Sequence, residues 1–213
     1  MFIPPFYREN DIETLVAFMK KYHFATIVSF DGTIPLATHL PFLVEHEHEQ
    51  AKITLVSHMA LANPQWRTFA EQDVLVMFQG PHAYISPQYY ESRYGVPTWN
   101  YAAVHVYGKP VIYSQAEDVA QTLLQTIRTF EPAYEKHFDA IPQDYTEKLK
   151  QELVAFEIQV TKIEGAFKLS QDKPLPIRQR VADALAQSPD TVVAELGNMM
   201  QRQLPKAESG EEQ

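Results

Sequence analysis

One segment, residues 96–108 (VPTWNYAAVHVYG), concentrates side chains that could line a binding site. The pattern predicts an extended strand, in which successive side chains point to opposite faces. One face then carries aromatic or polar-tipped side chains, namely Trp99, Tyr101, His105 and Tyr107, and Asn100 lies on the other. Such a strand indicates either a subunit interface or the wall of a site for a flat, polar ring.

Two polar pairs interrupt apolar stretches elsewhere in the chain. Thr38 and His39 lie within residues 36–42 (LATHLPF), and Ser57 and His58 precede a predicted helix. The first pair is either satisfied inside the protein or faces a ligand. The second pair stands at a helix N-terminus, where it either caps the helix or binds an anion.

Positive charge gathers between residues 162 and 180, in a chain that is acidic overall. This stretch has five basic and two acidic side chains. The whole chain has 18 Lys and Arg against 27 Asp and Glu, a formal net charge of −9. The cluster is either ordinary surface charge or a recess for the phosphate group of a small ligand.

A His-x-His pair, His46 and His48, lies in the acidic run EHEHEQ. Imidazoles at this spacing can bind a transition metal, and the flanking carboxylates would help. A solvated hairpin loop explains the same charge run. We favour the loop and expect no metal site.

Several classes of chemistry have no support in the sequence. Neither G-x-S-x-G nor H-E-x-x-H occurs, so nothing indicates a hydrolase. The absence of cysteine excludes disulfides, thiolate nucleophiles and iron–sulfur clusters, and the 7 glycines form no Walker or Rossmann loop. No residue is assigned a catalytic role, and whether the protein is an enzyme stays open.

The spacing of apolar residues predicts the elements that position these side chains. Helices are expected at residues 11–22, 59–71 and 147–154, from Ser114 to about Phe130, and in two segments after Pro176, the second capped by Ser188. Strands are expected at residues 24–30, 34–44, 51–57, 73–79, 82–86, 99–113 and 155–163. Short connections between these strands favour a small closed barrel over a doubly wound sheet.

Composition also bears on location and partners. The chain shows no signal peptide and no apolar run long enough to span a membrane, which predicts a cytoplasmic protein. An acidic chain repels a phosphate backbone, and acidic residues match the basic ones within residues 177–202. We therefore doubt direct binding to DNA.

Five segments, in this order, resemble the PaiB family of FMN-binding proteins of the transcription-regulator type. They are LATHLPF, HMALANPQW, GPHAYISPQYY, VPTWNYAAVHVYG and KLSQDK. The resemblance extends from Met1 to about Met200. It implies a β-rich α+β fold, an FMN-binding split β-barrel of the pyridoxamine-phosphate-oxidase-like kind with flanking helices. It also implies a homodimer with FMN at the subunit interface.

The resemblance, together with the helices expected after Pro176 and the polar end of the chain, gives a domain organisation. The resemblance also implies a set of site residues. The expected domains are a split barrel at residues 1–170, a C-terminal helical extension at 171–204 and a disordered tail at 205–213. The residues expected to contact FMN are Thr38, His39, Ser57, His58, Trp99, Asn100, Lys168 and Gln171.

The expected roles of these residues differ. In related flavin barrels a strand followed by a helix supplies phosphate contacts, and the matching stretch here runs from Thr54 to Pro64. That stretch lacks the lysine and arginine of the oxidases, so Lys168 and Gln171 are expected to contact the phosphate instead. Thr38 and His39 would meet the edge of the isoalloxazine. Trp99 and Asn100 would line its ring.

Family proteins are described as negative regulators linked to protease production and sporulation. The expected function is therefore negative regulation of transcription by a flavin protein that senses a redox state or a ligand. One alternative is an FMN-dependent oxidoreductase on a small substrate, since the cofactor itself carries such chemistry. Another is a haem-binding split barrel that uses His39, His58, His82 or His105 as ligands.

Overall fold

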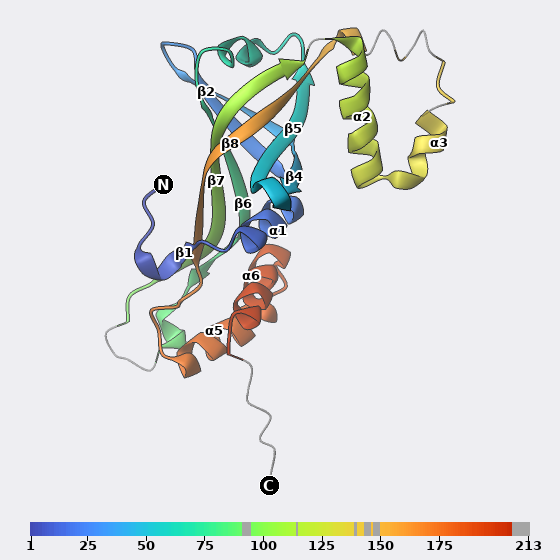
Figure 1. Cartoon of the computed structure of the whole chain (residues 1–213). Helices are drawn as coiled ribbons and strands as arrows, with labels where there is room; N and C mark the ends of the chain where they lie inside the picture. Colours follow the sequence, from blue (N-terminus) through green and yellow to red (C-terminus); the bar gives the residue numbers. More distant parts are fainter. Residues whose placement is uncertain (91–94, 114, 139, 143–145, 147–149, 206–213) are drawn as a thin grey trace. The chain divides into compact units, whose positions relative to one another are not determined.

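The structure, a computed structural model, describes residues 1–90, 95–113, 115–138, 140–142, 146 and 150–205 (Figure 1). The strands are β1 (Arg8–Glu9), β2 (Phe24–Phe30), β3 (Pro35–Pro41), β4 (Leu43–Glu47), β5 (Lys52–Ala60), β6 (Val74–Ile85), β7 (Thr98–Tyr113) and β8 (Leu153–Lys168). The α-helices are α1 (Ile12–Lys21), α2 (Ala116–Phe130), α3 (Glu135–Phe138), α5 (Leu175–Ala186) and α6 (Thr191–Arg202). Short 3-10 helices include η2 (His48–Gln50), η3 (Pro64–Thr68) and η4 (Pro87–Tyr89).

The chain divides into two compact units. The helical unit comprises Met1–Glu9, Gly80–Ala103 and Gly165–Gln213, and the barrel unit comprises Asn10–Gln79 and Val104–Glu164. Strands β6, β7 and β8 contribute residues to both. The expected domain boundaries at residues 170 and 204 remain predictions, and most of the expected disordered tail lies outside the described residues.

The sheet follows the order β3-β2-β6-β7-β8-β5-β4, with β1 paired to β8. Among the described strands this path does not close on itself, in contrast to the closed barrel expected from the strand connections. Its two ends, β3 and β4, are nevertheless consecutive in the chain and separated by Phe42 alone. One extended segment therefore pairs first with β2 and then, after Phe42, with β5.

The change of partner at Pro41 has a local cause. Proline has no N–H and so cannot continue a ladder as a donor. The next amide, that of Phe42, donates instead to the carbonyl of His23, at 2.9 Å. The Ser57 hydroxyl, on β5, donates to the Pro41 carbonyl at 2.7 Å. The single strand expected at residues 34–44 is thus two strands with different neighbours.

Phenylalanine side chains fill the core of the barrel unit around this point. Phe42 is buried and meets Phe78 and Phe156 edge-on, with ring centroids 6.0 and 6.3 Å apart. Phe69 packs against Phe156 in the same way, at 5.1 Å. Edge-to-face contacts are a favourable arrangement of aromatic rings. The residue that separates β3 from β4 is therefore also a centre of packing.

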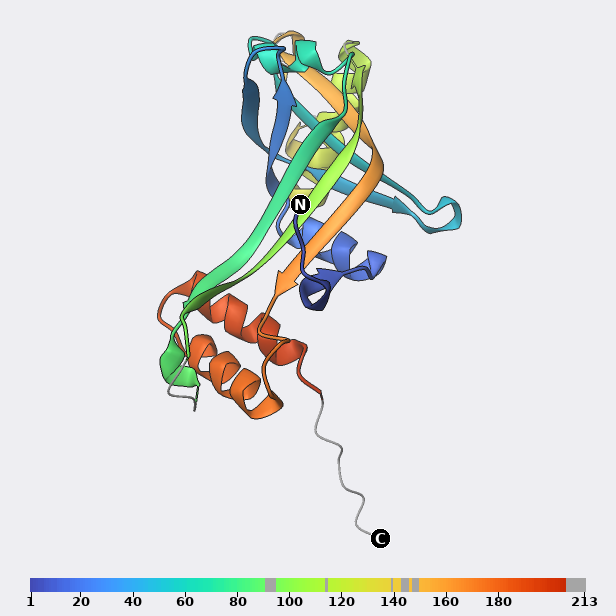
Figure 2. The same ribbon diagram turned by 90° about the vertical axis from the view of Figure 1, so that its left-hand side faces the viewer.

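Two further expected elements of the barrel unit differ from the structure. No α-helix forms at residues 59–71, because β5 continues to Ala60 and only the 3-10 helix η3 comes after it, capped by the Asn63 side chain at the Gln65 amide. The acidic run EHEHEQ is not a free loop, since its first three residues belong to β4 (the hairpin at the right of Figure 2). The expected helices α1 and α2 are confirmed, although Ser114 lies outside the described residues.

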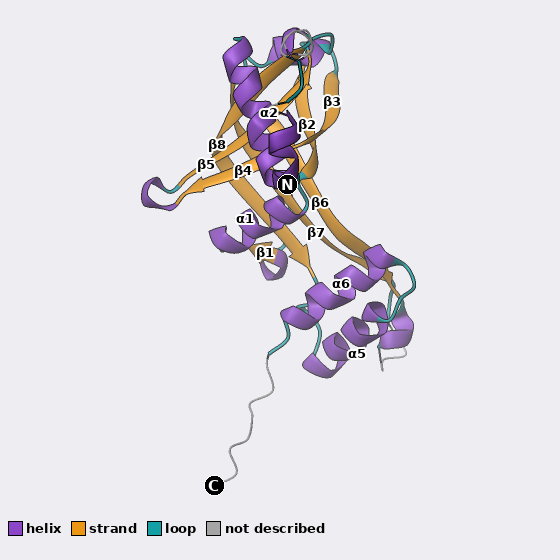
Figure 3. Ribbon diagram, turned by 90° about the vertical axis from the view of Figure 1, so that its right-hand side faces the viewer, coloured by secondary structure: helices purple, strands orange, loops and turns teal. Residues whose placement is uncertain are grey.

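Helices α5 and α6 form an antiparallel pair in the helical unit (Figure 3). Asp190, rather than the expected Ser188, caps α6, because its carboxylate accepts from the amides of Val192 and Val193. Gly197 allows the close approach, since a β-carbon there would lie 2.2 Å from the backbone nitrogen of Ala186. Among the described residues, no helix is both long and apolar enough to cross a membrane.

Replacing Phe42 with alanine tests the role of this residue in the barrel unit. We expect Phe42→Ala to lower the free energy of unfolding by about 3–5 kcal/mol, because it leaves a cavity beside the rings of Phe78 and Phe156. Phe2→Ala, at an exposed position, should change it by less than about 0.5 kcal/mol. Urea denaturation followed by circular dichroism measures the free energy of unfolding of both variants. An equal loss of stability in the two variants would contradict the role of Phe42 as a centre of packing.

Candidate functional site

A hollow of about 160 Å³ lies in the helical unit. It is lined by Tyr7, Tyr90, Val96, Pro97, Thr98, Asn100, Lys168, Ser170, Asp172 and Lys173. The N-terminal segment, the start of β7 and the end of β8 with the turn after it supply most of these residues. The hollow thus brings together Asn100 and Lys168, two of the residues predicted to contact FMN.

Two buried polar atoms at this hollow have no hydrogen-bond partner among the described residues: the Tyr90 hydroxyl and Oδ1 of Asn100. The Asn100 Nδ2 donates to the Ser170 hydroxyl at 2.8 Å and approaches the Met200 sulfur at 3.6 Å. Thioether sulfur is a weak acceptor, so one end of the amide lacks a strong partner whichever way it is turned. Buried polar groups without partners are rare and mark places where a ligand or water belongs.

Lys168 gives the hollow its positive charge. Its Nζ donates to the Thr98 hydroxyl at 2.5 Å and lies 5.8 Å from the centroid of the Tyr7 ring. No carboxylate of the described residues lies within ion-pair distance of it, whereas Lys173 is neutralised by Asp172 at 2.8 Å. Lys168 is therefore the cation that remains available to an anionic ligand.

Tyr7 is tied to the acidic side of the hollow. Its burial, together with the charge of Asp172 and a hydrogen bond to that carboxylate, raises the pKa of Tyr7 to about 12. The phenol therefore stays protonated at neutral pH and acts as a donor. Asp172, occupied by Tyr7 and Lys173, is partly screened from an anion held by Lys168.

Gln171 shapes the turn rather than facing the hollow. Its side-chain oxygen accepts from the Leu169 amide at 2.7 Å, and its side-chain nitrogen donates to the Phe167 carbonyl. Both polar ends are thus bonded to backbone. Ser170, which precedes Gln171 in this turn, has a φ of +63°. This left-handed conformation costs a non-glycine residue about 1–2 kcal/mol. The Gln171 bonds hold Ser170 where its hydroxyl meets Asn100.

The side chains at the hollow fit one end of FMN. FMN carries a phosphate, which lysine binds as a point charge, and free polar atoms such as the Tyr90 hydroxyl suit a polyol or phosphate oxygen. The volume is below the 300–1,000 Å³ typical of pockets that enclose a whole small-molecule ligand. The residues present therefore suit the phosphate end and leave the ring to another surface.

Trp99 and Asn100 point to opposite faces of β7. Asn100 is fully buried, whereas Trp99 is exposed and meets His82 and Tyr84 edge-on, with centroids 6.0 and 6.2 Å apart. The alternation follows from the two-residue period of a strand. Trp99 consequently belongs to an aromatic surface and not to the hollow.

In the barrel unit, Thr38 lies in a network of side-chain amides. Its hydroxyl donates to the Gln65 side chain at 2.5 Å and accepts from Asn63 at 3.0 Å. Gln65 in turn donates to the carbonyls of Ile27 and Leu36. This network fastens η3 to strands β2 and β3, so the Thr38 hydroxyl already has partners.

His39 lies on the opposite face of β3, which is exposed. Its Nδ1 is 2.8 Å from the Thr26 hydroxyl, and its ring stacks with the exposed Phe24 at 6.4 Å between centroids. The same face is apolar across neighbouring strands, because Val28 pairs with Ala37 on β3 and Leu75 on β6. We call this the outer face, formed by Phe24, Thr26, Val28, Ala37, His39, Leu75 and Met77.

Ser57 and His58 do not stand at a helix N-terminus, because both lie within β5. The helix expected after this pair is therefore wrong, and an anion site can no longer be argued from its N-terminus. Ser57 is buried and bonded to Pro41. Burial lowers the pKa of His58 below its usual 6.5, which leaves the imidazole uncharged at neutral pH.

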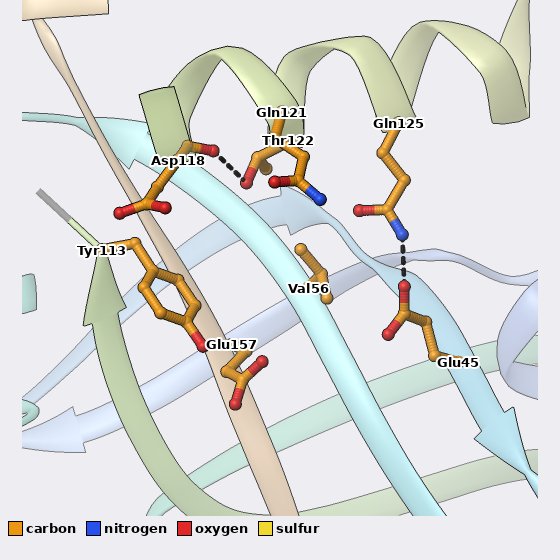
Figure 4. Close-up of a pocket in the computed structure, with 8 residues that line it drawn as sticks. All are labelled: Glu45, Val56, Tyr113, Asp118, Gln121, Thr122, Gln125 and Glu157. Atoms are coloured by element: carbon orange, nitrogen blue, oxygen red, sulfur yellow. Dashed lines mark hydrogen bonds between the residues drawn. The ribbon is translucent and has the colours of Figure 1, made fainter. Parts of the chain in front are cut away.

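A second hollow, of about 300 Å³, lies between α2 and the strands of the barrel unit (Figure 4). Its lining includes the carboxylates of Glu45, Asp118 and Glu157 and the Tyr113 phenol, whose pKa is raised by burial and by a hydrogen bond to Glu157. The lining residues include no lysine, arginine or histidine. Like charges repel, so this hollow is unsuited to a phosphate.

Four residues of the first hollow escape the sequence analysis: Tyr7, Tyr90, Thr98 and Ser170. Three of them lie inside the quoted motifs, Tyr90 in GPHAYISPQYY, Thr98 in VPTWNYAAVHVYG and Ser170 in KLSQDK. Attention to small hydroxyls beside the chosen residues would have found Thr98, next to Trp99, and Ser170, next to Gln171. Nothing in the sequence marks Tyr7, which reaches the hollow from the N-terminal segment.

Solved structures share this fold at low sequence identity. The flavocytochrome Anf3 from Azotobacter vinelandii is 15% identical, with a TM-score of 0.60 over 76% of this chain and 69% of its own. The FAD and heme binding protein from Mycobacterium smegmatis is 16% identical, with a TM-score of 0.59 over 76% and 73%. The fold is that of the flavin-binding split β-barrels, as the family resemblance implies.

The family follows from sequence matches. Residues 1–162 match the family described as "Putative FMN-binding domain". The chain is 37% identical to the "Protease synthase and sporulation protein PAI 2" of Bacillus subtilis (strain 168), over 97% of this chain and 99% of that protein. The chain belongs to this FMN-binding, PaiB-like family, which confirms FMN as the expected cofactor.

The uncharged state of His58 predicts a pH dependence of stability. The unfolded chain takes up a proton as the pH falls below about 6.5, whereas the folded chain resists it. The stabilising effect is therefore complete above pH 6.5 and is lost as the pH falls, with a limiting slope of about 1.4 kcal/mol per unit. Urea denaturation between pH 8 and pH 5 should show a shallower decline for His58→Gln, and an unchanged decline would contradict the burial of this imidazole.

Proposed function

We propose that the protein is an FMN-binding negative regulator of the PaiB type, which senses a redox state or a ligand through its flavin. The observation that carries the proposal is Lys168, a cation without a carboxylate partner among the described residues, beside two unpartnered buried polar atoms. An anionic group would satisfy Lys168 and the Tyr90 hydroxyl, and a hydroxyl of the same ligand could donate to Oδ1 of Asn100. The flavin, when bound, supplies the redox chemistry.

Within this proposal Lys168 contacts the phosphate, while Asn100 and Tyr90 offer hydrogen bonds beside it. Gln171 acts as a positioning residue through its bonds to the backbone. The isoalloxazine needs a wider, flatter surface, for which the exposed Trp99 and His39 are candidates on their respective units. The eight residues predicted from the sequence thus take different roles, and not all of them touch the cofactor.

The regulatory part rests on the Bacillus relative, whose name associates it with protease synthesis and sporulation. Coverage of nearly the whole of both chains supports a shared role. We place the protein in the cytoplasm, where such regulators act.

We further propose that the protein is a homodimer that associates through the outer face. This face exposes Phe24 and His39 and carries the half-buried Val28, Leu75 and Met77 on adjacent strands. Apolar and aromatic side chains gathered on one surface are typical of protein interfaces. A second copy presents the same surface, as a two-fold interface requires.

Regulation through a protein or small-molecule partner fits the helical unit better than direct contact with DNA. In the α5–α6 pair Arg180 donates to the Tyr89 carbonyl at 3.1 Å, and Gln179 and Gln201 both donate to Asp183. The pair therefore offers no uninterrupted basic face, which DNA binding demands. A sequence-specific gel shift that weakens with salt would contradict this view.

An FMN-dependent oxidoreductase is the second candidate function. The observation in its favour is the pair of histidines whose pKa values burial lowers, His58 and His105, because an uncharged imidazole can accept a proton. Flavin that stays oxidised under NADH and NADPH without oxygen would exclude the simplest form of this activity. The two neighbours named for haem support a haem-binding variant, which a haemin titration would test.

Replacing Lys168 tests the flavin site. We expect Lys168→Met to weaken FMN binding by about 10–100-fold, because a hydrogen bond from a charged group contributes about 1.5–3 kcal/mol. Binding of riboflavin, which lacks the phosphate, should stay unchanged. Quenching of flavin fluorescence on titration measures both affinities.

The exposed Lys109 provides the matched control, and Lys109→Met should bind both flavins as the parent protein does. Equal losses for FMN and riboflavin would show that Lys168 does not contact the phosphate. If the parent protein bound neither flavin, the FMN-dependent part of the proposal would be wrong.

A charge on the outer face tests the dimer. We expect Val28→Glu to convert the protein to a monomer in sedimentation velocity, since a carboxylate there would be desolvated at the interface. Leu175→Glu, an exposed position in α5, should leave association unchanged. A parent protein that sediments as a monomer, or a variant that still dimerises, would contradict the assignment.

A further inference from the structure

Three side chains from two different elements of the barrel unit and the turn beside them meet at one point. Glu13 lies in the first turn of α1, His46 near the end of β4, and His48 in the 3-10 turn η2. Their nearest carboxylate oxygen and ring nitrogens all lie within 4.8 Å of one another. The structure thus adds a carboxylate, from a distant part of the sequence, to the His-x-His pair.

The distances suit a shared metal ion. The Oε1 of Glu13 is 3.4 Å from Nδ1 of His46 and 3.3 Å from Nδ1 of His48. Zinc binds nitrogen and oxygen ligands at about 2.0–2.2 Å in a tetrahedron, whose edges are then about 3.3–3.6 Å long. The carboxylate oxygen therefore already stands at the separation that coordination would require from each imidazole.

His46 supplies an independent sign that a ligand belongs here. Only 7% of its side chain is exposed, and its Nδ1 forms no hydrogen bond with any described residue. A buried ring nitrogen without a partner is unfavourable. The carboxylate oxygen of Glu13 lies 3.4 Å from this nitrogen without forming a hydrogen bond to it, a separation that suits two ligands of one metal ion.

We propose that Glu13, His46 and His48 bind a divalent zinc ion. Two imidazoles and one carboxylate form a donor set that suits zinc, whereas calcium and magnesium prefer oxygen ligands alone. The side chains of Glu13 and His48 are 62% and 71% exposed, so the fourth position opens to solvent and takes a water molecule. His48 can turn toward the ion because it is exposed.

The ion would fasten α1 to the β4–β5 hairpin. Helix α1 lies beside β4, and the zinc would join the first turn of the helix to the end of that strand. Because these residues are separate from Lys168 and Asn100, the proposal stands whether or not the flavin assignment is correct. Zinc would act here as a structural clamp, and its binding would stabilise the folded chain.

Zinc titration of the full-length protein tests the site. In competition with a chromophoric chelator, we expect one equivalent of Zn²⁺ to bind and the unfolding temperature to rise. His48→Ala and Glu13→Gln should each weaken binding at least tenfold and abolish the rise in unfolding temperature. Both positions are exposed, so circular dichroism should confirm that each variant folds like the parent.

Glu49→Gln is the matched control, since it removes an exposed carboxylate from the same turn without touching the three ligands. It should bind zinc as the parent does. Cobalt in place of zinc should give the intense visible absorption of a four-coordinate ion in the parent and in Glu49→Gln only. No binding by the parent, or equal binding by all variants as for an adventitious ion only, would overturn the proposal.

Discussion

The barrel unit depends on one segment that belongs to both ends of its sheet. Residues 35–47 pair with β2 up to Pro41 and with β5 from Leu43, and Phe42 fills the core between the two halves. The covalent chain performs the closure that a ladder of hydrogen bonds would otherwise provide. Neither end of the sheet can fray without disturbing the other, so we expect this unit to unfold as one cooperative whole.

In the helical unit, a turn with a strained backbone at Ser170 positions the side chains of a polar hollow. The side chain of Gln171 bonds on both sides of Ser170 and holds it in a left-handed conformation. Ser170 then meets one end of the Asn100 amide and leaves the other end free. Strain of this kind persists where the surroundings enforce it and is typical of functional sites. It is the reason why Asn100 is oriented toward the hollow beside Lys168.

Helices and strands with regular apolar spacing are predictable from the sequence, whereas the choice of which strands pair with each other is not. The strand at residues 24–30 and the helix at 11–22 follow from apolar spacing and are confirmed. The spacing says nothing about Phe42, because an extended chain has the same pattern whichever neighbour it pairs with. The helix expected at residues 59–71 is wrong because β5 extends further and the segment that begins at Pro64 forms only a 3-10 turn.

The site was predictable only in part, for a similar reason. Asn100 and Lys168 lie in motifs that the family resemblance brings forward, and both line the hollow. Tyr7 lies in no recognisable motif, and only the tertiary fold brings it to the hollow. Thr38 and Ser57 have the residue types of ligand contacts, yet their hydroxyls are bonded to Gln65 and Pro41. Residue type shows what a side chain can do, but only its neighbours decide what it does.

Strand β3 bears on how copies of the chain can meet. It is an end strand of the sheet, paired with β2, and it begins at Pro35 and ends at Pro41. A free strand edge invites further strands and thereby aggregation, whereas proline, which offers no N–H, interrupts such growth. The prolines at its two ends shorten the stretch that could recruit another strand. Self-association is thereby directed away from fibre-like extension of the sheet and toward contact between side-chain surfaces, which can saturate at two copies.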